Sequence, residues 1–390
     1  MNAPATKPNP LGLTSDEFVR LYSGSVLVGR LGGVPGALEA YRTIFREGVC
    51  DLPGANVPAV RVSRVLREDS PEGEVVKFLT HMPKAPEMPA GSLFRLPVAS
   101  AAPEDLAAES VLIPMTGSKG ETTYTLCLSS QVGCAMGCGF CETAQMGLIR
   151  SLLPHEIVAQ WFAAVHVVGV RPRNIVFMGM GEPFDNYDNV IRAVAVLKDH
   201  NGPHMGVSRI TISTVGRVDG IRRLAEQIKE PGWHRLGLAL SLNAPNDELR
   251  ERLMPVNKRW KLADVQRALV EWPKFAGNKL CVEYVLIPGV NDAREHAVQI
   301  AEFLRPFGVH KSVTGDATNK LRAVLNLIPY NPRRDSPWPA PGEDEVERFM
   351  GWLVEEGVFV KRRRTKGRRM MGACGQLGSE EIRARRAVAR

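Results

Sequence analysis

From residue 124 onward, short apolar runs rich in β-branched residues alternate with segments whose apolar positions recur at helical spacing. In the first helical segment Ile157, Trp161 and Val165 fall on one face behind Pro154, which is favourable in a first helical turn. The predicted strands are 124–130, 174–178, 209–214, 235–243, 280–287 and 323–330. The predicted helices are 154–168, 187–199, 218–229, 262–275, 293–304 and 344–356. This alternation predicts an α/β fold, a partial (βα)₆ TIM-type barrel with its chemistry at the carboxyl ends of the strands.

The rest of the chain is divided by composition. A Pro- and Ala-rich stretch, 82–103, predicts a linker or loose hairpin, and 305–322 predicts a long insertion before the last barrel strand. We therefore expect a smaller N-terminal domain over 1–105, the barrel over 106–360 and a basic C-terminal segment over 361–390.

Charge is concentrated at one end. The 390 residues have a net charge of +8, yet residues 361–390 hold eleven basic and two acidic residues, so the other 360 sum to −1. Such a run is commonly a solvated tail, and it also suits docking of a phosphate backbone. The seven cysteines are odd in number, and no uncharged apolar run approaches the length of a membrane span, so we expect a cytoplasmic protein with reduced thiols.

Three cysteines follow the first predicted barrel strand in a CxxxCxxC spacing: Cys134, Cys138 and Cys141. A cubane iron–sulfur cluster needs four ligands, so three thiolates leave one iron open to a small molecule such as S-adenosylmethionine, which uses this arrangement to start radical chemistry. Two other interpretations are open on spacing alone. One is a structural zinc site with Cys127 as fourth ligand, and the other is a disulfide with a spare thiol.

Two further motifs can carry chemistry. The loop Gly179-Met-Gly-Glu-Pro183 follows the second strand, where glycines admit a ligand to the backbone and a carboxylate can hold an ammonium group; it could also be a plain turn. Cys374 lies between Gly372 and Gly375, so its thiol could move and act as a nucleophile, or be a chance cysteine in a turn. Cys50 and Cys281 are interpreted as packing thiols.

Over residues 105–378 the combination of motifs resembles the RlmN/Cfr family, closer to RlmN. The motifs are Cys127-Leu-Ser-Ser-Gln-Val-Gly-Cys134, the cysteine loop, Thr143-Ala-Gln-Met-Gly147, the 179–183 loop, Ala244-Pro-Asn-Asp-Glu-Leu-Arg250, Leu327-Ile-Pro-Tyr-Asn-Pro332 and Ala373-Cys-Gly-Gln-Leu377. Members of this family are radical S-adenosylmethionine (radical SAM) enzymes that methylate an adenine of large-subunit ribosomal RNA, and some also methylate tRNA.

The resemblance implies roles for residues of this sequence. Cys134, Cys138 and Cys141 would bind one [4Fe-4S] cluster. Cys374 would carry the methyl group as S-methylcysteine, and Cys127 would resolve the RNA adduct through a transient disulfide with Cys374. Glu109 would face the adenine or accept a proton, although on spacing alone it is expected to be an exposed strand-edge carboxylate. The residues expected to contact S-adenosyl-L-methionine are Gly181, Glu182, Ser213, Ser241, Leu242, Asn243 and Asn331. The implied partners are 23S rRNA, tRNA as in some members, and an electron donor such as flavodoxin or ferredoxin, with the protein acting as a monomer.

The resemblance favours C2 of adenine as the methylated carbon, with C8 as the alternative. Two hypotheses of other classes stand beside it: a radical enzyme acting on a peptide or small molecule, which would not need the basic segment, and a zinc-stabilised RNA-binding protein, which would need neither Cys374 nor the 179–183 loop.

Overall fold

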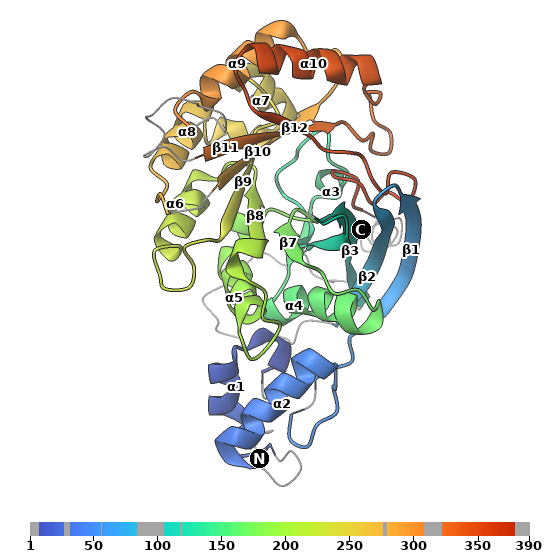
Figure 1. Ribbon diagram of the computed structural model, residues 1–390, viewed down its shortest axis with the longest axis vertical. Coiled ribbons are helices and arrows are strands. Elements are labelled where there is room, and N and C mark those ends of the chain that lie inside the picture. The colour runs from blue at the N-terminus through green and yellow to red at the C-terminus, as the bar shows by residue number, and fades with distance from the viewer. Residues whose placement is uncertain are drawn as a thin grey trace.

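The computed structural model describes residues 8–26, 32–55, 57–83, 105–117, 119–275, 279–307 and 322–378 (Figure 1). Most of the predicted linker 82–103, most of the predicted insertion 305–322 and the last twelve residues of the basic segment lie outside these ranges. No helix in the described ranges is long and apolar enough to cross a membrane.

Six parallel strands form the centre of the fold, and each lies within or overlaps a predicted strand. In spatial order they are β4 (Thr122–Cys127), β7 (Asn174–Phe177), β8 (Ile210–Thr214), β9 (Gly237–Ser241), β10 (Lys279–Leu286) and β11 (Arg322–Pro329). A short strand, β12 (Val360–Arg362), adds in parallel to β11. The predicted (βα)₆ topology is confirmed.

The predicted helices are also present, and they lie outside the curved sheet (Figure 1). They are α4 (Pro154–Phe162, continued by a π-helical turn at Ala163–Val167), α5 (Tyr187–Lys198), α6 (Val218–Gln227), α8 (Leu262–Val270), α9 (Arg294–Leu304) and α10 (Glu343–Glu355). Pro154 opens α4 as expected, and Ile157 and Trp161 are fully buried against the sheet. Shorter elements complete the barrel: α3 (Glu142–Gln145), α7 (Asp247–Leu253), β5 (Gln131–Gly133), β6 (Leu148–Ser151) and single helical turns at Pro183–Asn186, Val207–Arg209 and Pro255–Lys258.

The N-terminal part contributes both helices and strands. A turn at Pro10–Gly12, α1 (Ser15–Tyr22) and α2 (Gly33–Glu47) lie beside α4 and α5 (Figure 1), and the Ser15 amide donates to the Asp199 carboxylate at 2.7 Å. The strands β1 (Val62–Ser70), β2 (Gly73–Pro83) and β3 (Asp105–Thr116) extend the barrel sheet through antiparallel pairing with β4. The sheet is therefore continuous across the predicted division at residue 105.

The chain after β12 spans the side of the barrel between its last and first strands, which are not paired with each other in the described residues. The Arg363 amide donates to the Leu327 carbonyl of β11 at 2.8 Å. Further along, the Met371 carbonyl accepts from Lys77 Nζ at 2.9 Å, and the Gly378 amide donates to the Glu109 carboxylate at 2.9 Å. Cys374 lies between Met371 and Gly378, the two residues that these hydrogen bonds hold in place.

Candidate active site

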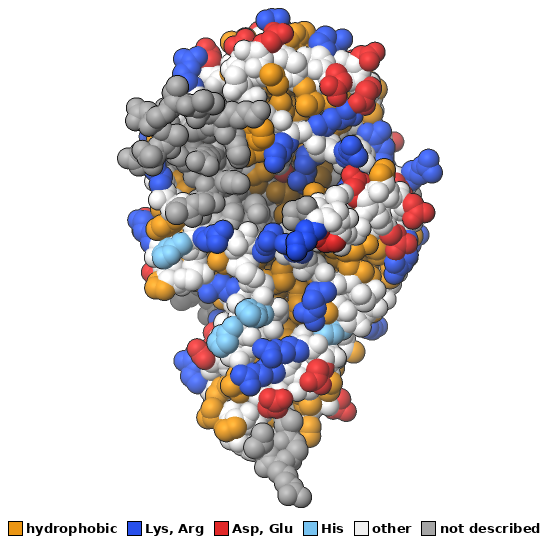
Figure 2. Space-filling view, viewed as in Figure 1, with side chains coloured by type: hydrophobic (Ala, Val, Ile, Leu, Met, Phe, Trp, Pro, Cys, Tyr) orange, Lys and Arg blue, Asp and Glu red, His pale blue; other side chains and the backbone are white. Residues whose placement is uncertain are grey.

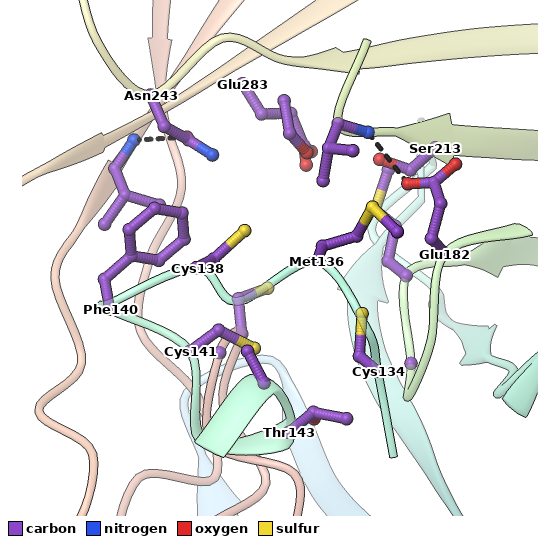
Figure 3. A pocket seen from close by; sticks show the side chains of 18 of the residues that line it. Cys134, Met136, Cys138, Phe140, Cys141, Thr143, Glu182, Ser213, Asn243 and Glu283 are labelled. Atoms are coloured by element: carbon purple, nitrogen blue, oxygen red, sulfur yellow. Dashed lines mark hydrogen bonds between the residues drawn. The ribbon is translucent and has the colours of Figure 1, made fainter. Parts of the chain in front are cut away.

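One pocket at the carboxyl ends of the strands gathers most of the predicted site residues (Figure 3). Ten of them line it: Cys134, Cys138, Cys141, Gly181, Glu182, Ser213, Ser241, Asn243, Asn331 and Cys374. Residues from four strands and two loops reach one place because parallel strands bring their carboxyl ends to the same edge of a sheet.

The start of the cysteine loop has a backbone conformation that requires glycine. Gly133, just before the loop, has a φ of 76°, and a Cβ there would lie 1.9 Å from the Gly147 carbonyl oxygen, so this position requires glycine. That close approach lets the Cys134 amide donate to the same carbonyl at 3.0 Å. A turn hydrogen bond of 3.2 Å from the Cys141 amide to the Cys138 carbonyl then directs the second and third thiols toward the same space (Figure 3).

The three thiols of the cysteine loop line one pocket. Cys134, Cys138 and Cys141 are not disulfide-bonded, and burial, helped by their mutual proximity, raises the pKa of the Cys134 and Cys138 thiols. Coordination to a metal removes such protons. Among the described residues, no three His, Cys, Asp or Glu side chains are placed to hold one metal ion, and Cys127 does not line the pocket. The alternative of a zinc site completed by Cys127 is therefore not supported.

The glycine loop after β7 packs tightly on the residues that precede the cysteines. A Cβ at Gly179 would lie 2.6 Å from the Leu128 carbonyl oxygen, and one at Gly181 would lie 2.5 Å from Cβ of Gln131. Gly181 also has a φ of 97°, a conformation that favours glycine. The Gln131 side chain accepts a hydrogen bond of 2.9 Å from the Glu182 amide. The loop is thus fixed to the start of the cysteine loop.

Glu182 presents a buried carboxylate to the pocket. One of its oxygens accepts from the Phe184 amide at 3.1 Å and the other from the Val215 amide at 2.9 Å. Burial raises the pKa of Glu182 to about 7, against the lowering effect of these hydrogen bonds. A cationic group entering the pocket would favour the charged form, so this residue can hold an ammonium group.

Two asparagines shape the opposite wall. Asn243 has a φ of 55°, and its side-chain oxygen accepts from the Val285 amide at 3.0 Å, which links β9 to β10. The Asn331 side chain donates to the Cys374 carbonyl at 3.4 Å and accepts from Arg368 at 3.1 Å. The predicted cofactor residue Asn331 thus also holds the segment that bears Cys374.

Three predicted residues do not line this pocket. The Leu242 side chain is fully buried, and Cys127, the last residue of β4, is buried. Glu109 was expected to be an exposed strand-edge carboxylate on spacing alone, and this is wrong. It lies on β3 between two other strands, is fully buried, and forms an ion pair of 3.0 Å with Lys77.

Sequence reasoning did not assign three charged residues that surround the site. Arg250, fully buried, donates to the carbonyls of Leu242 and Val215 and so ties the ends of β8 and β9 together. Glu283, on β10, lines the pocket, and Arg363 lies beside Cys374 in a second pocket. A single carboxylate within the apolar run of β10 was the signal that could have revealed Glu283.

This second pocket is basic and shares Cys374 with the first. Its lining includes Arg362, Arg363, Arg364 and Lys366, together with Glu72, residues of β3 and residues 372–374. Figure 2 shows Lys and Arg side chains gathered around a hollow on one face of the molecule. Cys374 therefore lines both the pocket that contains the cysteine loop and the basic pocket.

Comparison with known proteins identifies the family to which the chain belongs. Residues 128–304 match the model of the radical SAM superfamily. Over 283 residues the chain is 44% identical to a protein of Protochlamydia amoebophila named probable dual-specificity RNA methyltransferase RlmN 1, covering 73% of each chain. The chain belongs to the RlmN family.

Other members show the same relation. A Campylobacter jejuni protein named dual-specificity RNA methyltransferase RlmN is 41% identical over 70% of this chain and 75% of its own length. Among solved structures, a radical SAM methyltransferase from Sphaerobacter thermophilus superposes with a TM-score of 0.76 and 31% identity, covering 95% of this chain and 99% of the other. The radical SAM fold and the RlmN family membership expected from the sequence motifs are confirmed.

Proposed function

We propose that this protein is a radical SAM RNA methyltransferase that adds a methyl group to a ring carbon of adenine through an S-methylcysteine at Cys374. The observation that carries the proposal is the position of Cys374 in the wall shared by the two pockets. A sulfur placed there can receive a methyl group on the cofactor side and deliver it on the basic side. The names of the relatives, which are RNA methyltransferases, support RNA as the substrate.

The residues have distinct tasks in this proposal. Cys134, Cys138 and Cys141 would hold a [4Fe-4S] cluster, and Glu182 would bind the ammonium group of S-adenosylmethionine. The cluster and S-adenosylmethionine, when bound, supply the radical chemistry that a non-nucleophilic ring carbon of adenine requires. Cys374 would carry the methyl group. Cys127, whose pKa is raised by burial and by the neighbouring Cys374, would resolve the RNA adduct through a transient disulfide.

The basic pocket favours RNA over a peptide or small molecule. Arg364 is exposed and, with Lys366, faces Glu72, whose carboxylate lies 3.5 Å and 3.3 Å from the two cations. A phosphate can replace a carboxylate between two such cations, because both are anions that accept several hydrogen bonds. An uncharged substrate would not form ion pairs with these cations.

Within the family, we propose C2 of adenine in 23S rRNA as the main target, with tRNA as a second substrate and C8 as the alternative carbon. We also propose a cytoplasmic monomer reduced by a flavodoxin or ferredoxin. The role of Glu109 at the adenine stays a prediction, since its carboxylate is engaged by Lys77 and Gly378.

The test is mass mapping of adenines in ribosomal and transfer RNA from cells with and without the gene. Purified protein, reconstituted anaerobically with iron and sulfide, should restore the missing mark on RNA from the deletion strain. The variant with Ala at the three loop cysteines is the control and should lose iron and methylation together. No difference between the two RNA preparations, or purified protein that holds zinc and no iron, would refute the proposal.

A further inference from the structure

Glu283 places an unpartnered carboxylate oxygen at the active-site pocket. In the register of the parallel sheet it lies opposite Ser241 of β9 and Asn326 of β11, so its side chain is on the inner face of the barrel. It lines the pocket, is 6% exposed, and is seen above the cysteine loop in Figure 3. Its Oε1 atom is buried and has no hydrogen-bond partner among the described residues. A buried carboxylate normally has its oxygens satisfied, so this exception needs an explanation.

The side chains around Glu283 form one electrostatic group. Arg363 and the thiols of Cys127, Cys281 and Cys374 all interact with it electrostatically. Burial raises the pKa of Glu283, while the positive charge of Arg363 and a hydrogen bond from the Asn326 side chain lower it. Cys374 is an exposed residue, yet the protein atoms around its thiol desolvate it and raise its pKa, and Arg363 opposes this rise.

Methylation of a thiol must release a proton, because a thioether sulfur carries none. The pocket has two carboxylates, and both oxygens of Glu182 already accept backbone amides. Outside the pocket, Glu109 is occupied by Lys77 and by the Gly378 amide. Glu283 is therefore the carboxylate that lines the pocket with Cys374 and has a free oxygen.

We propose that Glu283 accepts the thiol proton of Cys374 when this sulfur takes its methyl group; the inference rests on the function proposed above. The S–H bond of Cys374 breaks and its proton passes to Oε1 of Glu283. The sulfur forms a bond to the methyl carbon as the bond between that carbon and the sulfonium of S-adenosylmethionine breaks. The electron pair of the broken bond stays on the departing S-adenosylhomocysteine, so atoms and charges balance. Arg363 stabilises the negative charge that develops on the sulfur.

The test is methyl loading of Cys374 without RNA and without reductant. Reconstituted wild-type protein is mixed with S-adenosylmethionine, and the Cys374 peptide is followed by mass spectrometry. Glu283→Gln should load roughly 10²-fold more slowly at neutral pH, the range for loss of a positioned proton acceptor. The deficit should shrink as the pH rises, since Cys374 then ionises without an acceptor. Iron content and affinity for S-adenosylmethionine should match the wild type, and Glu226→Gln, at an exposed position of α6, should load normally.

The outcomes separate the two proposals. If the wild type loads no methyl on Cys374, the proposed function fails, and this inference fails with it. If the wild type loads and Glu283→Gln loads at the same rate, only the role of Glu283 is overturned, as it is by a deficit that does not change with pH. If Glu283→Gln does not fold, Glu283→Asp takes its place, because it keeps the charge but moves the carboxylate away by the length of one methylene. A wild-type loading rate in Glu283→Asp would overturn the inference.

Discussion

The ion pair between Lys77 and Glu109 should stabilise the protein and hold the segment that carries Cys374. The two side chains are 3% and 0% exposed and their charged atoms lie 3.0 Å apart. Lys77 also donates to the carbonyl of Met371, and Glu109 accepts from the amide of Gly378, so the pair anchors both ends of this segment. Lys77→Met removes the cation, keeps the length of its stem and leaves a buried carboxylate without its counter-charge.

The magnitude follows from that burial. Removing one partner of a buried pair costs about 3–5 kcal/mol of unfolding free energy, because the remaining charge is uncompensated. Loss of the hydrogen bond to Met371 adds about 1 kcal/mol. We therefore expect Lys77→Met to lower the unfolding free energy by about 4–6 kcal/mol. The double variant with Glu109→Gln should recover most of this loss, since the glutamine oxygen can still accept from Gly378.

Urea unfolding followed by circular dichroism measures these differences, and hydrogen exchange of residues 371–378 reports whether the segment is released. Lys229→Met is the matched control, because Lys229 forms an exposed pair with Glu226 at 2.7 Å that should contribute less than about 1 kcal/mol. A Lys77→Met variant within about 1 kcal/mol of the wild type would refute the reasoning. So would a double variant as unstable as the single one.

Three further predictions concern the two pockets. Gly181→Ala should lower the unfolding free energy by about 1–3 kcal/mol in urea titrations and bind S-adenosylmethionine more weakly, because its φ is 97° and its Cβ would meet Gln131. Gly351→Ala, within α10 and facing open space, is the control and should stabilise by about 0.5–1 kcal/mol, because alanine favours a helix interior. Glu182→Gln should weaken S-adenosylmethionine binding by roughly 10- to 100-fold in calorimetric titrations. Since burial raises the pKa of Glu182 to about 7, wild-type affinity should fall as the pH drops through that value; pH-independent affinity would contradict this role. Replacing Arg364 and Arg369, both exposed, by Gln should lower the slope of log affinity for RNA against log salt by about 1 for each phosphate that is no longer neutralised. An unchanged slope would mean that these two arginines do not contact the RNA phosphates.

The central barrel could be predicted from sequence because each of its strands is a short apolar run followed by an amphipathic helix. The antiparallel strands β1 to β3 were not predicted. In β1 all nine residues are exposed or half-buried, so it has no alternation of buried and exposed positions that would identify a strand. The cysteine and glycine motifs are local, and their side chains meet because neighbouring parallel strands end together.

The remaining features depend on pairings between residues distant in the sequence. The anchor from Lys77 to Met371 joins residues 294 positions apart, and no local pattern specifies such a pairing. Glu109 looked like a surface carboxylate because glutamate is mostly exposed, and only the register of β2 against β3 reveals its buried partner. Glu283 was not predicted, although it is a single carboxylate within an apolar run, because the register of β10 against β9 and β11 is needed to show that it faces the pocket.

The most direct test of the proposed function compares two single variants. Cys374→Ala should retain the cluster but transfer no methyl to RNA, because it lacks the sulfur that carries the group. Cys127→Ala should instead accumulate protein covalently joined to RNA through the Cys374 methylene, because the step that releases the adduct is blocked. On denaturing gels with labelled RNA, we expect a shifted, nuclease-sensitive band for Cys127→Ala and none for Cys374→Ala. RNA methylation that survives in Cys374→Ala would contradict the account.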